Sequence, residues 1–139
     1  MNSWFILSLV SAVGFGVVPL FLKVLTMSYS PQLVMAWYYS IVAIILWGVA
    51  SMTTKLTVPT PSNILLVVVV SVIAAVADLA IFYAYKIASN GGYPRSVQAF
   101  SIVIATIIGA IAYRQFPSTA GIFGVILIFV GIVLLSGLK

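Results

Sequence analysis

The sequence contains no cysteine and no histidine, and its 139 residues include only one acidic side chain, Asp78. Without cysteine there is no disulfide and no thiolate metal site, and without histidine a common metal ligand and general base is missing. One carboxylate provides neither an acid–base pair nor the ligand set of a metal centre. We therefore expect no enzymatic activity, no cofactor and no bound metal.

Charge of either sign is also scarce. Charged side chains make up 5% of the residues and hydrophobic ones 64%, and the mean hydropathy is +1.32. About a quarter of the residues of a soluble domain are charged, so most of this surface must face lipid. The net charge of +5 comes from six cations spread singly along the chain. Because no basic cluster could follow a phosphate backbone, we expect no nucleic-acid partner.

Five apolar segments have the length of about 20 residues that a hydrocarbon core of ~30 Å requires. Runs such as residues 65–73 lack the alternation of a barrel strand, and only helices or closed barrels pair all their backbone groups in lipid. The sequence therefore predicts an all-α fold, a polytopic integral membrane bundle of five transmembrane helices that forms one domain over residues 1–139. The expected helices cover about 3–27, 31–52, 63–88, 95–113 and 119–138.

Short connections with turn residues separate these segments, so neighbouring helices are expected to be antiparallel. The first segment lacks the features of a cleaved signal peptide, and we expect it to be retained. Four cations fall on one side of the bilayer and two on the other, which favours an outer N-terminus and a cytoplasmic C-terminus in the plasma membrane. The two sets are Lys23, Lys86, Arg95 and Lys139 against Lys55 and Arg114.

Asp78 lies near the middle of the third segment. An aspartate there costs roughly 2.5–3.5 kcal/mol on insertion scales, and such a residue usually faces the protein interior or a wet cavity. Helical spacing places Phe82 and Tyr85 on the same face, with Lys86 nearby. The functional interpretation is a carboxyl group that binds a proton, a cation or an amine. The structural alternative is a paired aspartate that only joins two helices.

Further candidates for a substrate or ion site are Lys23, Tyr38, Tyr83, Tyr85 and Gln98. Lys23 is either a cation that reaches the membrane surface or one that faces a cavity, as the counter-charge of Asp78 or the partner of a substrate carboxylate. Trp37, Tyr38 and Tyr39 either form an aromatic belt or line a cavity for apolar or aromatic substrates, to which Tyr83 and Tyr85 would contribute from the third helix. Gln98 either binds substrate or bonds to a neighbouring helix.

Small residues recur at four-residue spacing in the last two segments, at Ser101, Ala105 and Gly109 and again at Ala120 and Gly124. Such faces let helices approach closely. We interpret them as packing surfaces, within one chain or between chains, and assign them no chemistry.

Taken together, the order of several features resembles the EamA-type repeat of the drug/metabolite transporter superfamily. The features are Gly14 and Lys23 in the first segment, Pro31 followed by Trp37, the Tyr83-Ala84-Tyr85 stretch, and the glycine-rich run 121–135. The resemblance covers the whole chain. Full-length members of that superfamily have ten helices, built as two five-helix inverted repeats around a central cavity, so the resemblance implies that this chain needs a second copy.

The resemblance implies a secondary transporter, an exporter of small organic metabolites or drug-like solutes, that works by alternating access as a dimer of five-helix units. The partner is either a second copy of this chain, for which an antiparallel arrangement rebuilds the inverted pair, or a related chain. Two other interpretations remain: a non-transporting membrane subunit or regulator that assembles with another membrane protein, and a dual-topology channel.

Overall fold

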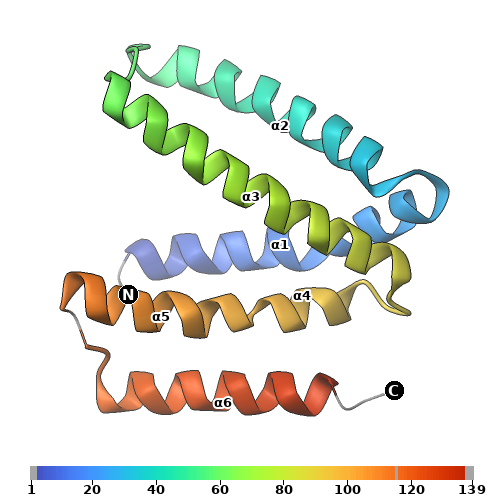
Figure 1. The fold of residues 1–139 in the computed structure, drawn as a ribbon, viewed down its shortest axis with the longest axis vertical. Helices are drawn as coiled ribbons and strands as arrows, with labels where there is room; N and C mark the ends of the chain where they lie inside the picture. Colours follow the sequence, from blue (N-terminus) through green and yellow to red (C-terminus); the bar gives the residue numbers. More distant parts are fainter. Residues whose placement is uncertain (1–2, 115, 137–139) are drawn as a thin grey trace. The chain divides into compact units, whose positions relative to one another are not determined.

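The computed structural model of the chain describes residues 3–114 and 116–136. These residues form helices and turns, with no strand among them, which confirms the predicted all-helical fold. Figure 1 shows the helices in chain order: α1 (Ser3–Ser28), α2 (Pro31–Thr53), α3 (Pro61–Ile87), α4 (Gly92–Gln98), α5 (Phe100–Tyr113) and α6 (Thr119–Ser136).

The contacts within the chain define two compact units, where the sequence suggested one domain. Unit 1 comprises Met1–Pro19 and Ala88–Lys139, and unit 2 comprises Leu20–Ile87. The border falls inside α1, at Pro19. A proline inside a helix removes one backbone hydrogen bond and disfavours a straight continuation. The first part of α1 therefore belongs with α4, α5 and α6, and its last turns belong with α2 and α3.

Two helix starts differ from the expected bounds because proline is accepted in a first turn. The third helix begins at Pro61 and not at residue 63, since the N–H that proline lacks has no partner at that position anyway. The fourth begins at Gly92, with Pro94 inside its first turn. The last predicted helix, 119–138, is described as far as Ser136, and the rest lies outside the described residues.

The fourth predicted span, 95–113, consists of two helices that meet at Ala99. The N–H of Ala99 bonds to the carbonyls of both Arg95 and Ser96, at 3.2 and 3.1 Å, and the N–H of Ile102 bonds back to Ala99 at 3.0 Å. Bonds over three residues tighten the backbone relative to an α-helix. The helix is therefore locally overwound between Gln98 and Phe100, although Gly92–Tyr113 is still long enough to span a membrane.

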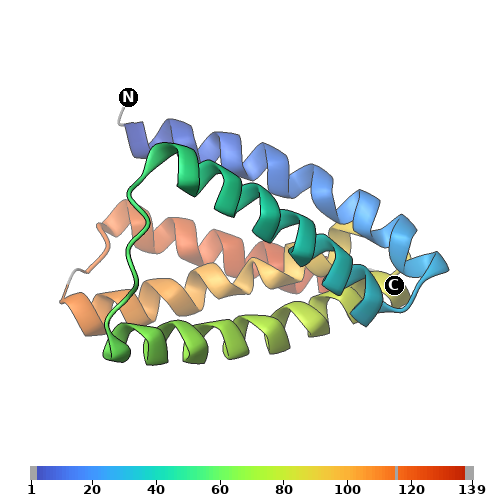
Figure 2. The same ribbon diagram turned by 90° about the horizontal axis from the view of Figure 1, so that it is seen from above.

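Unit 2 is built on the antiparallel pair α2 and α3, which lie side by side and are joined by the extended loop seen in Figure 2. Its buried residues gather where the end of α1 turns into α2 and against the last turns of α3. The Thr26 hydroxyl donates to the carbonyl of Lys23 at 3.0 Å, so this fully buried polar group is satisfied within α1. These buried residues are Leu22, Thr26, Pro31, Val34, Phe82 and Tyr85.

In unit 1, both α4 and α5 contact α6. The rings of Phe100 and Phe129 pack with their centroids 5.9 Å apart and fasten the start of α5 to α6. The connection between α5 and α6 ends at Ser118, whose hydroxyl accepts the N–H of Gly121 at 3.2 Å. This bond satisfies one of the amides at the start of α6, which have no partner inside the helix.

Most large apolar side chains remain exposed. Ile44 of α2 is 72% exposed and Val76 of α3 is 67% exposed. Among the described residues, α1, α2, α3 and the α4–α5 stretch are long and apolar enough to cross a membrane, with 11% or less of each span buried, and Thr119–Leu135 is a shorter apolar helix. Exposed apolar area costs about 25 cal/mol per Å² in water. Such a surface is stable only against lipid or against further protein.

Candidate functional site

Asp78 pairs with a tyrosine of the neighbouring helix. The Tyr39 hydroxyl of α2 donates a hydrogen bond of 2.5 Å to Oδ2 of Asp78 on α3. Tyr39 lies eight residues after the start of α2 and Asp78 nine residues before the end of α3. At ~1.5 Å per residue, both lie roughly 12–14 Å from the same end of the helix pair. In a hydrocarbon core of ~30 Å this is close to the midplane.

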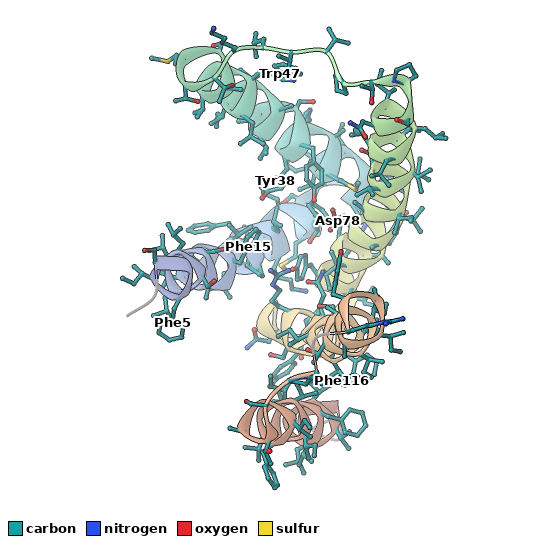
Figure 3. All side chains as sticks on the ribbon, turned by 90° about the vertical axis from the view of Figure 1, so that its left-hand side faces the viewer. Phe5, Phe15, Tyr38, Trp47, Asp78 and Phe116 are labelled. Carbon is teal, nitrogen blue, oxygen red and sulfur yellow. The ribbon has the colours of Figure 1, made fainter. Side chains whose placement is uncertain are left out.

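An aromatic cluster, formed by Tyr38, Tyr39, Phe82 and Tyr85, lies around this pair. The Phe82 ring is its centre, with centroid distances of 6.2 Å to Tyr38, 6.5 Å to Tyr39 and 6.1 Å to Tyr85. Phe82 and Tyr85 are each 2% exposed, and the Tyr38 ring packs edge-on against Tyr39 with centroids 5.0 Å apart. Figure 3 labels Tyr38 on α2 and Asp78 on α3. Tilted rings at these distances attract one another. The cluster thus gives the half-buried carboxyl group a rigid apolar wall and a fixed hydroxyl donor.

Lys23 lies in the same unit, three residues after Leu20, where the unit begins. Its ammonium group donates to the main-chain carbonyl of Lys86 at 3.2 Å, which joins the end of α1 to the end of α3. Lys86 is eight residues after Asp78 on α3, or ~12 Å along the helix. The sequence suggested Lys23 or Lys86 as the partner of Asp78, and the hydrogen bond found for Asp78 comes from Tyr39 instead.

Tyr83 lies five residues after Asp78 on α3. Its hydroxyl accepts a hydrogen bond from the Gln32 side-chain amide of α2. This bond joins the two helices one to two turns nearer to the end at which α2 begins and α3 ends. Between Gln32 and Tyr39, α2 and α3 enclose an apolar groove of about 400 Å³. Its walls are Gln32, Met35, Ala36, Tyr39, Ala75, Val76 and Leu79. Tyr83 therefore fixes the helix pair that carries the Asp78 site.

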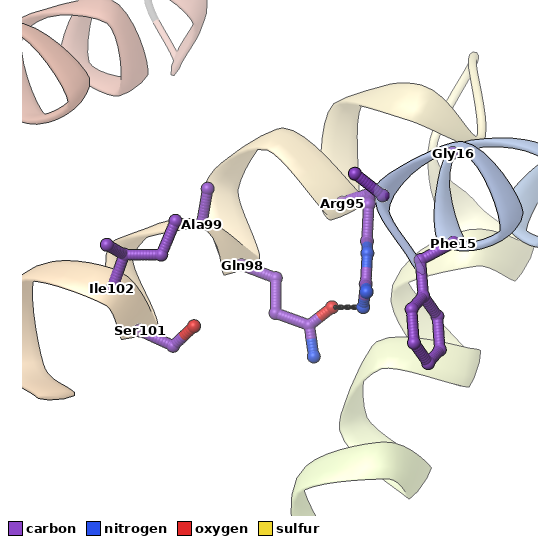
Figure 4. A pocket seen from close by; sticks show the side chains of 8 residues that line it. Phe15, Gly16, Arg95, Gln98, Ala99, Ser101 and Ile102 are labelled. Atoms are coloured by element: carbon purple, nitrogen blue, oxygen red, sulfur yellow. Dashed lines mark hydrogen bonds between the residues drawn. The ribbon is translucent and has the colours of Figure 1, made fainter. Parts of the chain in front are cut away.

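Gln98 lies in unit 1, in a separate pocket of about 490 Å³ between α1 and the α4–α5 junction (Figure 4). Its side-chain oxygen accepts a hydrogen bond from the Arg95 guanidinium group, one turn earlier on α4. That guanidinium group also lies over the Phe15 ring of α1, 5.0 Å from the centroid. Ser101 lines the same pocket. Gln98 thus belongs to a cluster of polar side chains around the Arg95 cation.

Two residues of these sites were not listed among the predicted site residues. Arg95 was assigned only to the membrane surface, although its spacing of three residues from Gln98 puts both on one helix face. Tyr39 was grouped with Trp37 and Tyr38, either as an aromatic belt or as the lining of a cavity. The Trp37 ring packs edge-on against Tyr29 near the helix start, with centroids 5.2 Å apart, whereas the Tyr39 hydroxyl bonds to Asp78. Two residues along an α-helix differ by only ~3 Å in depth but by roughly 200° in direction, so the face of α2 separates the two roles.

Comparison with known proteins places the chain in a family. No curated protein and no solved structure matches it. The sequence profile of the EamA-like transporter family matches residues 2–137. This match confirms the resemblance seen in the sequence, and the family consists of membrane transporters and not of enzymes. Because it covers the chain almost from end to end, this integral membrane protein belongs to the EamA-like transporter family.

Proposed function

We propose that the chain is a secondary transporter that exports small organic metabolites or drug-like solutes, working by alternating access as a dimer of five-helix units. The observation that carries this proposal is the Tyr39–Asp78 pair. A carboxyl group close to the midplane of two spanning helices is costly in lipid and marks an ion or substrate pathway by default. Asp78 is the only acidic side chain of the protein, so it is the residue that takes the coupling proton or an amine.

Partial exposure of the pair supports a second copy. Asp78 is only half-buried, and Tyr39 is 37% exposed. Facing acyl chains, these groups would lack the hydrogen-bonding surroundings that polar atoms require in a bilayer. A second five-helix unit would enclose them in a cavity shared by both copies, and an antiparallel arrangement would reproduce the inverted repeats of transporters. A homodimer then presents two Asp78 carboxyl groups, one from each copy.

Open glycines point to the same conclusion. A methyl group built on Gly109 of α5, or on Gly124 or Gly131 of α6, meets no described atom within 4 Å. These three glycines therefore leave open space beside the faces of α5 and α6 on which they lie. Small residues in spanning helices serve close helix approach, and we assign these faces to the dimer.

Charge supports an orientation as well. Lys23 and Lys86 are joined at one end of unit 2, whereas Lys55 lies in the loop at the other end of α2 and α3. The positive-inside rule favours the end with more cations as cytoplasmic. We accordingly propose a plasma-membrane protein with an outer N-terminus and a cytoplasmic C-terminus. The difference in cation number between the two sides is small, so a second copy could insert in the opposite orientation.

Export by proton exchange is tested in liposomes that contain the purified protein and a radiolabelled probe, hydrocinnamate or phenylpropylamine. Loss of probe is followed after an inward proton gradient is imposed. We expect the gradient to accelerate the loss from wild-type liposomes, and Asp78→Asn to lose this response. Tyr38→Phe, which removes a hydroxyl from the same aromatic cluster, should keep it. If Asp78→Asn responds to the gradient like the wild type, Asp78 is not the coupling site.

The dimer orientation has its own test, which the absence of cysteine makes clean. Leu56→Cys labels the loop between α2 and α3, and Asn90→Cys labels the opposite end of α3. In intact cells, an impermeant maleimide should modify about half of the copies of each variant if both orientations are inserted. Complete labelling of one variant and none of the other would exclude an antiparallel homodimer.

A further inference from the structure

The pocket of unit 1 holds a cation. Arg95 lies three residues after the start of α4, and its guanidinium group lies 5.0 Å from the centre of the Phe15 ring of α1. The side chain therefore extends into the pocket, where the sequence had suggested a residue at the membrane surface. A cation within a spanning segment is rare in membrane proteins and usually faces a cavity or a counter-charge.

The surroundings of Arg95 contain hydrogen-bond acceptors and an aromatic face, but unit 1 has no Asp or Glu in its sequence. Among the described residues, the guanidinium group bonds to the Gln98 side-chain oxygen and lies over the Phe15 ring. Both contacts orient the group without neutralising it. A guanidinium group has five N–H donors in a planar fork, so the bond to Gln98 leaves most of them for a ligand.

We propose that this pocket binds the carboxylate group of an organic anion with an apolar body. Binding in this pocket does not itself require transport. It rests on the proposed transport function in one respect: if the chain is a transporter, the pocket gives the class of solute that it carries. Arg95 would bind the two carboxylate oxygens as a fork, the geometry in which guanidinium and carboxylate groups match. Gln98 fixes the plane of that fork, and its amide N–H₂ is a further donor.

The walls and the charge define the ligand more closely. The pocket is about 490 Å³ in volume, and apart from the polar side chains it is lined by Ala12, Phe15, Gly16, Ala99 and Ile102. That volume is in the range of small-molecule sites, which combine apolar walls with a few polar groups. One cation matches one carboxylate, whereas a dianionic phosphate would leave a negative charge uncompensated inside the pocket.

The test measures equilibrium binding to the full-length protein in liposomes of phosphatidylcholine alone. The probes are radiolabelled hydrocinnamate and its uncharged amide, hydrocinnamamide, which share the phenylpropyl body. We expect the wild type to bind the acid about tenfold more tightly than the amide, and Arg95→Gln to abolish this difference without weakening amide binding. Arg95→Lys keeps the charge but loses the fork and should show an intermediate preference.

Two control variants show which cation causes the preference for the acid. Arg114→Gln removes the same kind of charge from the exposed end of α5 in the same unit and should leave the preference unchanged. Lys23→Gln tests the cation that the sequence suggested for a substrate carboxylate, and it should also leave the preference unchanged. A preference that disappears with Lys23→Gln and survives Arg95→Gln would overturn the assignment.

The remaining outcomes separate the site from the transport function. Equal wild-type binding of acid and amide would overturn the site even if the liposomes export the probes. A clear preference for the acid without any export would leave the site standing and contradict the proposed function. A wild-type protein that retains anionic phospholipid, with loss of this lipid in Arg95→Gln and no competition by hydrocinnamate, would mark a lipid site and overturn the proposal.

Discussion

The hydrogen bond between Tyr39 and Asp78 makes a quantitative prediction about stability. Bonds to a charged acceptor contribute about 1.5–3 kcal/mol in soluble proteins, whereas side-chain hydrogen bonds in membrane proteins average about 0.6 kcal/mol, with a maximum near 1.7. The distance of 2.5 Å and the carboxyl acceptor favour the upper part of the membrane range. The 37% exposure of Tyr39 favours the lower part. We expect a coupling energy of about 1–1.5 kcal/mol between the two side chains.

A double-mutant cycle measures this coupling. Tyr39→Phe, Asp78→Asn and the double variant are unfolded with sodium dodecyl sulfate in lipid–detergent micelles, and the transition is followed by tryptophan fluorescence. Tyr38→Phe is the matched control, because it removes a hydroxyl from the same aromatic cluster and no hydrogen bond of that hydroxyl to a described residue is seen. Combined with Asp78→Asn, it should be additive. Coupling of Tyr39 and Asp78 below about 0.3 kcal/mol, the scatter of independent sites, would refute the role given to this bond.

Two further predictions concern the ends of α5 and α6. Arg114, which caps the end of α5, has a left-handed backbone with φ of 53°. Because glycine adopts this conformation without steric strain, Arg114→Gly should stabilise the protein by about 0.5–1 kcal/mol in a thermal melt. A lower melting temperature would contradict this. A methyl group on Gly121 would lie 3.2 Å from Cβ of Pro117, whereas one on Gly124 meets nothing described. Gly121→Ala should therefore lower the stability of the isolated chain and Gly124→Ala should not, and equal melting temperatures would argue against this difference.

The sequence predicted the fold well because length and apolarity alone identify spanning helices. The apolar stretch Pro61–Ile87, with 27 residues, is far longer than a strand and long enough for a helix that spans the membrane. The bounds shifted where proline joined a helix, at Pro61 and Pro94. The overwinding at Ala99 has no comparable signal, because neither glycine nor proline stands at that position.

The site was harder to predict because these helices are apolar on nearly every side. In a soluble helix, the polar stripe shows which face is buried. In α3 the side that faces α2 and the side that faces lipid have the same composition, so the sequence identified Asp78 as important but not its partner. Which residue of α2 lies opposite Asp78 depends on the register of the two antiparallel helices. The loop between Thr53 and Pro61 is long enough to allow several registers, so the sequence does not determine that Tyr39 is the partner.

Arg95 illustrates the same difficulty for charge. Counting cations along the chain assigned it to the membrane surface, and it does lie only three residues after the start of α4. Its long side chain reaches the level of Phe15, however, and a side chain can extend from a helix end toward the membrane centre as well as toward water. Only the position of α1 beside α4 within unit 1 determines which direction is taken.

The two proposed sites together set the energetics of export. If Asp78 carries a proton inward while Arg95 releases an organic anion outward, both movements transfer positive charge into the cell. For one proton and one carboxylate, the membrane potential then contributes about 4.6 kcal/mol per cycle at 100 mV, twice the value for one charge. Outward symport of the same pair would be electroneutral and opposed by the proton gradient. A carboxylate exporter built on this chain therefore gains most from exchange, because the gradient and the potential drive the anion in the same direction.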